Sequence, residues 1–454
     1  MKLAQVSFAA AVLALALPLS AAMPAVPFQP DGQPDPDYQV PDELNLSYAL
    51  AFALDNNFAI RQAKERIRQQ EGIVLEVRSS QIPTVTGSAS YSRLDREVSS
   101  SGDDRTWAFG ITARQVLFAG GGVRASVRSQ QLALEAATLQ LQAVIDASLL
   151  DVRSRFYDVL VARERIKVQE QSVELLQRQL QDVKNRYEAG TVSNFEVLRA
   201  EVAVANAQTP LINARNSYRL AIEELRQSLG FTTTDAANVG RTPEFVGTLE
   251  FAPVSVELTS ALATAKERRP DLLRLRRLEQ AAEQGVLARR ADYYPDLAVA
   301  GSYNWNQTPF RRGLSDARDG WTLGLTSSWN IFDGRATAGR VAQARSVLEQ
   351  NRLVSQETEL SISVEVRRAI SSLQEATELA EASKKVVEQA DEAVRLADAR
   401  YAAGTATQLD VLQARTDLTT ARLNQLEAYY RFNVANAALR RAMGLPDEAL
   451  TAAR

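Results

Sequence analysis

The chain has 454 residues, with 52 Lys and Arg against 55 Asp and Glu, and it contains no Cys and no His. The net charge of −3, or −4 without Lys2, is too small and of the wrong sign for a nucleic-acid partner. The absence of Cys and His excludes disulfides, thiolate or imidazole metal sites, Cys nucleophiles and a His general base, so we expect no catalytic residues, no metal site and no cofactor.

Residues 1–22 are predicted to be a secretory signal peptide. They hold one cation, Lys2, then an apolar stretch, then small residues up to Ala22. The alternative is a transmembrane anchor, but an anchor needs about 20 apolar residues and this stretch is shorter. Residues 23–41 follow with six prolines and little apolar content, which predicts an extended linker.

From residue 42 onward the sequence contains two similar copies of one unit. An offset of 214 places Trp107 on Trp321 and Gly230 on Gly444, and upstream of Trp107 the offset drops to 212. A fixed offset between similar segments is typical of an internal structural repeat. We therefore predict repeat 1 over 42–230, an equatorial linker over 231–256, repeat 2 over 257–444 and a C-terminal tail over 445–454.

Repeat 1 is predicted to open with one helix and repeat 2 with more than one, and each repeat is predicted to continue with two strands. The strands are expected at about 84–94, 107–117, 297–306 and 321–331, where apolar and polar residues alternate. Aromatic residues near the ends of such strands are typical of a transmembrane β-barrel with lipid outside and water inside. The aromatic residues expected at the membrane interface are Tyr91, Trp107, Phe109, Tyr303, Trp305, Trp321 and Trp329.

The same alternation would also fit two ordinary hairpins that pack one face on a soluble core. After the N-terminal segment no stretch reaches 18 apolar residues, so transmembrane strands are favoured over transmembrane helices. Four strands cannot close a barrel, whose practical minimum is about eight. A membrane interpretation therefore requires at least a dimer.

Very long helices are predicted after the strands, over about 123–189 and 337–403. About 67 residues at 1.5 Å each make roughly 100 Å of helix, far longer than in an ordinary globular domain. Near the far end of each helix the apolar positions recur every 3.5 residues on average, which indicates coiled-coil packing. Gly190 and Gly404 are expected to end these helices, and returning helices are predicted over about 193–229 and 407–443.

The turns between these helices carry a resemblance that covers nearly the whole mature chain. Residues 186–191 read Arg-Tyr-Glu-Ala-Gly-Thr and residues 400–405 read Arg-Tyr-Ala-Ala-Gly-Thr, and an acid-Val-Leu-x-Ala string follows each of them. Together with the similar repeat openings at 43–50 and 257–262, they resemble the periplasmic tip of the TolC family of outer-membrane efflux proteins.

The resemblance implies an α/β membrane protein that is mostly α, is not an enzyme, and lies in the outer membrane with an extension into the periplasm. Three chains with four transmembrane strands each would form a 12-stranded barrel, continued by an α-helical tunnel. The implied partners are further copies of this chain as a homotrimer, outer-membrane lipid, a periplasmic adaptor protein, an inner-membrane pump, and exported small molecules or proteins, as in efflux or type I secretion.

The resemblance also implies a gate at the tip. Tyr401 matches a tyrosine that helps to hold the inner helix pair closed, and Asp410 matches an acidic ring at the constriction. One member of the family has a second acid where this chain has Gln413, and an arginine where this chain has Ala406. The contacts that hold the gate closed are therefore expected to be weaker or different here. The residues expected at the tip turns for adaptor docking are Arg186, Tyr187, Gly190, Thr191, Arg400, Gly404, Thr405, Val411 and Leu412.

Two interpretations of Asp410 remain open from the sequence. Three like charges in a narrow passage repel one another, raise each other's pKa and attract cations. Alternatively, Asp410 is an acid that stabilises the N-terminus of its own helix, and this second interpretation is favoured for Glu196.

A periplasmic coiled-coil adaptor or scaffold without a membrane barrel is the main alternative function. It explains the long helices but leaves four alternating strands with aromatic ends unexplained. A carboxylate-based hydrolase would need a convergent acidic pair, whereas the acids here are scattered along helix faces. The sequence leaves the cargo open, because one scaffold serves several transport functions.

Overall fold

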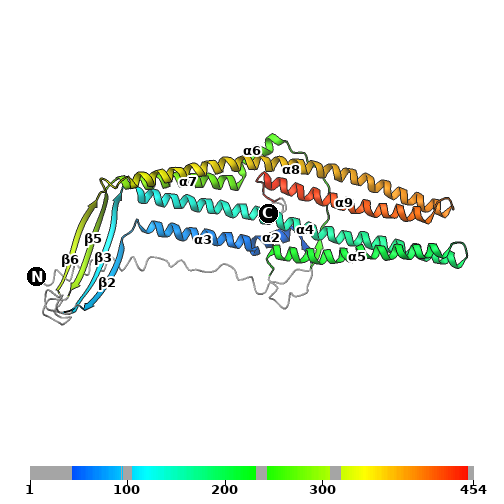
Figure 1. Ribbon diagram of the computed structural model, residues 1–454, viewed down its shortest axis with the longest axis horizontal. Helices are drawn as coiled ribbons and strands as arrows, with labels where there is room; N and C mark the ends of the chain where they lie inside the picture. The colour runs from blue at the N-terminus through cyan, green and yellow to red at the C-terminus, as the bar shows by residue number, and fades with distance from the viewer. Residues whose placement is uncertain (1–42, 94, 96–104, 232–242, 307–317, 448–454) are drawn as a thin grey trace. The chain divides into compact units, whose positions relative to one another are not determined.

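The computed structural model describes residues 43–93, 95, 105–231, 243–306 and 318–447 (Figure 1). The expected signal peptide and Pro-rich linker lie outside the described residues, as does the tail beyond residue 447. The chain is mostly helical and divides into two compact units. The first unit holds residues 66–137 and 275–354, and the second holds residues 43–65, 138–274 and 355–447 of the described part.

The first unit contains a four-stranded antiparallel sheet in the order β2-β3-β5-β6 (Figure 1). The strands are β2 (Thr84–Arg93), β3 (Arg105–Ala119), β5 (Asp296–Asn306) and β6 (Arg318–Ser328). Each repeat supplies one hairpin, and the two hairpins are joined where β3 pairs with β5. The sequence prediction was wrong about the end of the last strand, because β6 ends at Ser328 and leaves Trp329 outside it.

The register of the sheet places the apolar positions of all four strands on one face. One row across that face is Gly87, Ile111, Tyr303 and Trp321. The adjacent row, on the opposite face because side chains alternate, is Thr86, Thr112, Ser302 and Thr322. An irregularity between Val116 and Phe118 places Phe118 opposite Leu297. This bulge keeps Phe118 on the apolar face at the end of the strand.

Two helices of 67 residues each follow the hairpins: α4 (Gly122–Glu188) and α8 (Ala336–Ala402). The returning helices are α5 (Asn194–Leu229), which continues through Pro210 without a break, and α9 (Gln408–Ala442). In the second unit α8 and α9 pack through an apolar cluster that includes Leu373, Ala376, Phe432 and Leu439. In the described part of the chain, no helix is both long and apolar enough to cross a membrane.

The helical segment that opens each repeat is broken at one residue, which the sequence did not predict for repeat 1. Repeat 1 has α2 (Leu46–Asn56) and α3 (Phe58–Ser79). Repeat 2 has α6 (Leu258–Arg268) and α7 (Pro270–Arg290), followed by a short 3-10 turn, η1 (Ala291–Tyr293). Two short strands also lie in the second unit, where β1 (Glu43–Asn45) pairs in parallel with β4 (Glu244–Val246).

The glycine that follows each returning helix packs against the helix break of its own repeat. Gly230 has φ 82°, and a Cβ there would lie 2.4 Å from the carbonyl oxygen of Asn56. Gly444 has φ 70°, and a Cβ there would lie 3.0 Å from the carbonyl carbon of Arg268. Glycine is therefore required at both positions, first for the left-handed backbone and then for the close approach of another backbone.

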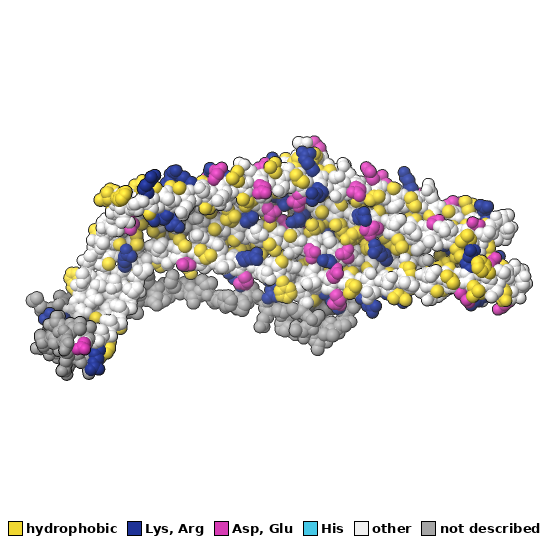
Figure 2. Space-filling view, viewed as in Figure 1, with side chains coloured by type: hydrophobic (Ala, Val, Ile, Leu, Met, Phe, Trp, Pro, Cys, Tyr) yellow, Lys and Arg dark blue, Asp and Glu magenta, His cyan; other side chains and the backbone are white. Residues whose placement is uncertain are grey.

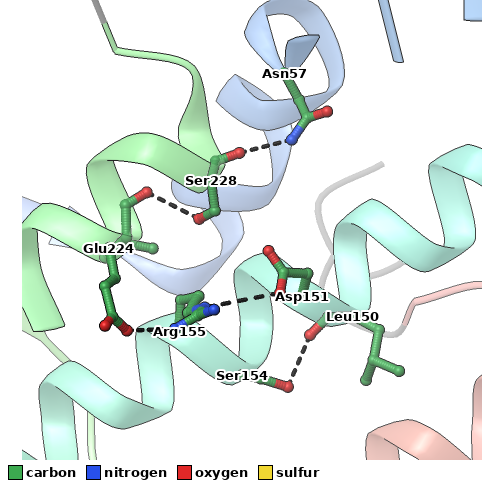
Figure 3. A network of polar contacts seen from close by, with 8 residues as sticks. Asn57, Leu150, Asp151, Ser154, Arg155, Glu224 and Ser228 are labelled. Atoms are coloured by element: carbon green, nitrogen blue, oxygen red, sulfur yellow. Dashed lines mark hydrogen bonds and ion pairs between the residues drawn. The ribbon is translucent and has the colours of Figure 1, made fainter. Parts of the chain in front are cut away.

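Polar contacts hold the junction in repeat 1 (Figure 3). The side-chain amide of Asn57 donates to the carbonyl oxygen of Ser228 over 2.6 Å. On α4, the guanidinium of Arg155 pairs with Glu224 of α5 and lies 3.7 Å from Asp151 of its own helix. Buried apolar side chains fill the space between these helices: Leu50, Phe156, Leu160, Leu225 and Leu229. This cluster is the main core of the second unit.

Candidate functional site

The apolar face of the sheet is exposed to an unusual degree. Tyr91, Trp321 and Leu323 have 66%, 56% and 64% of their surface accessible. On the face shown in Figure 2 few charged side chains lie over the strands, whereas acidic and basic side chains are mixed along the helices. A large exposed apolar surface marks a site of contact with lipid or with another protein.

Six of the seven predicted interface aromatics lie on this apolar face: Tyr91, Trp107, Phe109, Tyr303, Trp305 and Trp321. The ring of Trp305 lies 5.3 Å from Phe109 and 4.4 Å from Tyr303, between ring centres. Trp329 lies apart from them. It follows β6, and its indole Nε1 donates to the carbonyl oxygen of Tyr293 over 3.1 Å.

The tip turns of the two helix hairpins have the same backbone structure. Gly190 and Gly404 take left-handed φ values of 74° and 75°. The next residues, Thr191 and Thr405, donate their backbone N–H to the carbonyl oxygens of Arg186 and Arg400, both over 2.9 Å. The two Thr hydroxyls donate to the same carbonyl oxygens. The repeated Gly-Thr pair thus closes each long helix in a Schellman motif.

The two returning helices begin differently. At the start of α5 the N-cap residue Ser193 makes no side-chain capping hydrogen bond. At the start of α9 Thr407 and Asp410 form a capping box, in which the Asp410 carboxylate accepts from the Thr407 backbone N–H over 2.8 Å. These hydrogen bonds, first from the backbone and then from the side chain of Thr407, lower the pKa of Asp410 below its ordinary value. Asp410 therefore stabilises its own helix in the single chain.

Tyr401 contacts the opposite hairpin through its ring. The guanidinium of Arg186 lies over that ring, with its carbon 4.9 Å from the ring centre. The Tyr401 hydroxyl is buried and has no hydrogen-bond partner among the described residues. Gln413 does not join this contact, since it is exposed and its amide donates to Asp417 of its own helix over 2.9 Å.

The residues assigned to adaptor docking differ in accessibility. Val411 is 1% exposed, so in the single chain it is a packing residue and not part of the surface. Leu412 is half-buried. The other seven are exposed at the tip: Arg186, Tyr187, Gly190, Thr191, Arg400, Gly404 and Thr405.

Sequence reasoning missed two arginines that join α9 to both long helices. Arg415 donates to Gln179 of α4 over 2.9 Å and pairs with Asp398 of α8 at 3.1 Å. Seven residues later, Arg422 contacts Gln171 of α4 and Asp391 of α8 in the same way. The heptad spacing of both the arginines and the aspartates was the available signal, because residues seven apart lie on one face of a helix.

The described residues contain no group of three or more acidic, His or Cys side chains placed to hold a metal ion.

Comparison with known proteins shows to which family the chain is similar. The chain is 26% identical over 386 residues to the protein CyaE of Bordetella pertussis, covering 84% of this chain and 80% of that protein. It is 24% identical over 312 residues to the outer membrane protein TolC of Escherichia coli, covering 66% and 62% of the two chains. The CmeC outer membrane channel of Campylobacter jejuni superposes with a TM-score of 0.76 at 16% identity, covering 90% of this chain and 88% of that one.

The family described as outer membrane efflux protein matches residues 50–231 and 261–445, one match for each repeat. Both matches include a tip turn and its long helix. The chain has the fold of solved outer-membrane channels. It therefore belongs to the outer membrane efflux protein family, and its location is the outer membrane.

Proposed function

We propose that three copies of this chain form one exit channel, with a 12-stranded barrel in the outer membrane and an α-helical tunnel in the periplasm. The observation that carries the proposal is the sheet with one exposed apolar face, because a soluble fold would bury such a face. In a barrel the apolar face would meet lipid and the polar face would line the pore.

The edges of the sheet support an oligomer. Among the described strands, β2 pairs only with β3, and β6 pairs only with β5. Unpaired strand edges carry free backbone donors and acceptors, which have no partner in lipid. Pairing β6 of one copy with β2 of the next would satisfy both edges, and three copies would supply twelve strands.

The returning helix α5 also has a face suited to a neighbouring copy. Phe195, Leu198 and Val202 follow one another at helical spacing and are 64%, 52% and 58% exposed. Such a stripe is typical of helices that pack side by side. In the proposed tunnel it would contact an adjacent chain.

The tips would dock a periplasmic adaptor protein that links the channel to an inner-membrane pump. The exposed residues of the two Schellman turns are the proposed docking surface, and the repeated turn presents two similar sites per chain. Exported small molecules or proteins would then leave through the tunnel.

A pair of neighbouring substitutions tests the barrel. Leu323→Arg would place a charge on the apolar face, and Thr322→Arg would place it on the polar face. An arginine facing lipid at mid-depth costs about 2–4 kcal/mol, so Leu323→Arg should abolish the trimer band on an unboiled gel of outer membranes, and Thr322→Arg should preserve it. A wild-type chain found as a soluble monomer, or equal tolerance of both substitutions, would reject the barrel.

A further inference from the structure

The polar face of the sheet carries a cation, Arg114, in a setting of small neutral side chains, and a second one, Arg318, at the first residue of β6. Arg114 lies on β3, and its row across the sheet is Thr84, Arg114, Ala300 and Gly324. The next row on the same face consists of hydroxyl side chains: Thr86, Thr112, Ser302 and Thr322. The small neighbours at 300 and 324 leave the long Arg114 side chain room to project from the sheet.

Among the residues that the structure describes, no carboxylate lies beside the Arg114 guanidinium. Arg114 is exposed, and no ion pair joins it to any residue in the described part of the chain. The carboxylate of its own sheet face is Asp296, four residues along β5 from Ala300, or about 13 Å at 3.3 Å per residue. The positive charge is therefore not neutralised locally.

We infer that Arg114 forms a ring of three guanidinium groups in the channel lumen and that this ring attracts anionic solutes. The inference rests on the proposed trimer with the polar face inward. Rings of Arg or Lys favour anions in pores, and the adjacent hydroxyl row adds hydrogen-bond donors that an anion can use. Arg114 would thus favour the passage of anionic cargo through the barrel. It would do so from the polar face of the sheet, opposite the face that contacts lipid.

The absence of cysteine makes the orientation of Arg114 directly testable, because one substitution introduces the only thiol of the chain. Arg114→Cys and its neighbour Ala113→Cys form a matched pair, since position 113 lies in the apolar row with Val85, Gly301 and Leu323. A membrane-impermeant, anionic methanethiosulfonate reagent should change the single-channel current of Arg114→Cys and leave that of Ala113→Cys unchanged. Modification at 113 but not at 114 would overturn the inference.

The charge itself is tested by ion selectivity in planar bilayers. At 0.1 M salt the Debye length is about 10 Å, so loss of three charges should raise the K⁺ to Cl⁻ permeability ratio by about twofold in Arg114→Gln. Arg114→Lys keeps the charge and should match the wild type. At 1 M salt, where the Debye length is about 3 Å, the difference should disappear.

These experiments distinguish failure of the Arg114 inference from failure of the proposed trimer. If the wild-type chain forms heat-sensitive trimers that conduct, but Arg114→Gln has wild-type selectivity at 0.1 M salt, the cation ring is wrong and the channel stands. If the wild-type chain forms neither trimers nor channels, both fail.

Discussion

The guanidinium carbon of Arg186, in the last turn of α4, lies 4.9 Å from the centre of the Tyr401 ring, in the last turn of α8. This contact joins the tips of the two helix hairpins within one chain. It uses the ring face of the tyrosine, since the Tyr401 hydroxyl has no hydrogen-bond partner in the described part of the chain. We therefore expect closure of the tip to depend on the Tyr401 ring and the Arg186 cation.

Substitutions at the two residues should distinguish the contribution of the Tyr401 ring from that of the Tyr401 hydroxyl. A cation–π contact at an exposed site contributes about 0.5–1 kcal/mol, so Arg186→Gln and Tyr401→Leu should each raise the open fraction of the channel roughly two- to fivefold in planar-bilayer recordings. Tyr401→Phe keeps the ring and should behave as the wild type. If Tyr401→Phe opens the channel as much as Tyr401→Leu, the hydroxyl matters and the ring contact does not.

Asp410 should stabilise the start of α9 and, in the proposed trimer, give the channel a cation preference. Its pKa is lowered by hydrogen bonds from Thr407, so its contribution to stability is present above its unfolded pKa of about 3.9 and is lost as the pH falls through the lower folded value. We expect Asp410→Ala to reduce cation selectivity and block by multivalent cations at pH 7. The matched control is Glu196→Ala, at the corresponding place in α5, and an equal effect of the two substitutions would argue against a gate at Asp410.

Gly230 should be far less tolerant of substitution than Gly190, although both have left-handed backbones. An alanine in that conformation costs roughly 1–2 kcal/mol at either site. At Gly230 the new Cβ would also meet Asn56 at 2.4 Å, whereas at Gly190 nothing lies within 4 Å. Overpacking typically adds about 1–3 kcal/mol, so thermal unfolding of Gly230→Ala should begin at a clearly lower temperature. Equal midpoints for the two variants would show that the junction adjusts freely.

Arg269, at the helix break of repeat 2, is the buried cation whose removal should destabilise the second unit most clearly. Its side chain is 7% exposed and pairs with Asp271 and Glu365, both at 2.9 Å. The two carboxylates are 33% and 38% exposed, so they stay partly solvated when the cation is removed. Hydrogen bonds to charged groups contribute about 1.5–3 kcal/mol, so Arg269→Ala should lower the free energy of unfolding by about that amount in a urea titration. Arg268→Ala, at the exposed neighbour, serves as the control, and similar losses for both would contradict this role for the Arg269 pairs.

Gly444→Ala extends the comparison of the two repeats. Its Cβ would meet the backbone of Arg268 and Arg269 at 3.0 Å, a closer fit than normal but less severe than at Gly230. We expect a loss of stability between those of Gly190→Ala and Gly230→Ala, measured by the same thermal unfolding. A loss larger than that of Gly230→Ala would mean that the two junctions are not equivalent.

Several elements could be predicted from the sequence because their signals are local. Alternation with a period of two predicted the strands, and the absence of Pro together with a 3.5-residue repeat predicted the long helices. The shift of the last strand shows the limit of such signals. Trp329 continues the alternation of β6 in sequence, yet the strand ends at Ser328 and the indole instead donates to the carbonyl oxygen of Tyr293 in η1, before β5.

The candidate site likewise combines features that the local sequence predicts with contacts that it does not predict. The Gly-Thr turns were recognisable because a left-handed residue after a helix is a local requirement. The contact between Arg186 and Tyr401, and those of Arg415 with Gln179 and Asp398, join residues from different helices. A local period such as the heptad spacing of Arg415 and Arg422 marks one face of a helix, but it does not show which side chain of another helix that face meets.

The sequence by itself determined the duplication, the apolar and polar faces of the strands, and the two helix hairpins, since each depends on the spacing of residues within one segment. Only the tertiary structure decided that β3 pairs with β5, that Gly230 packs on the break at Asn57, and that Arg114 shares a row with Ala300 and Gly324. These relationships arise when segments distant in sequence meet and every buried backbone group must find a partner.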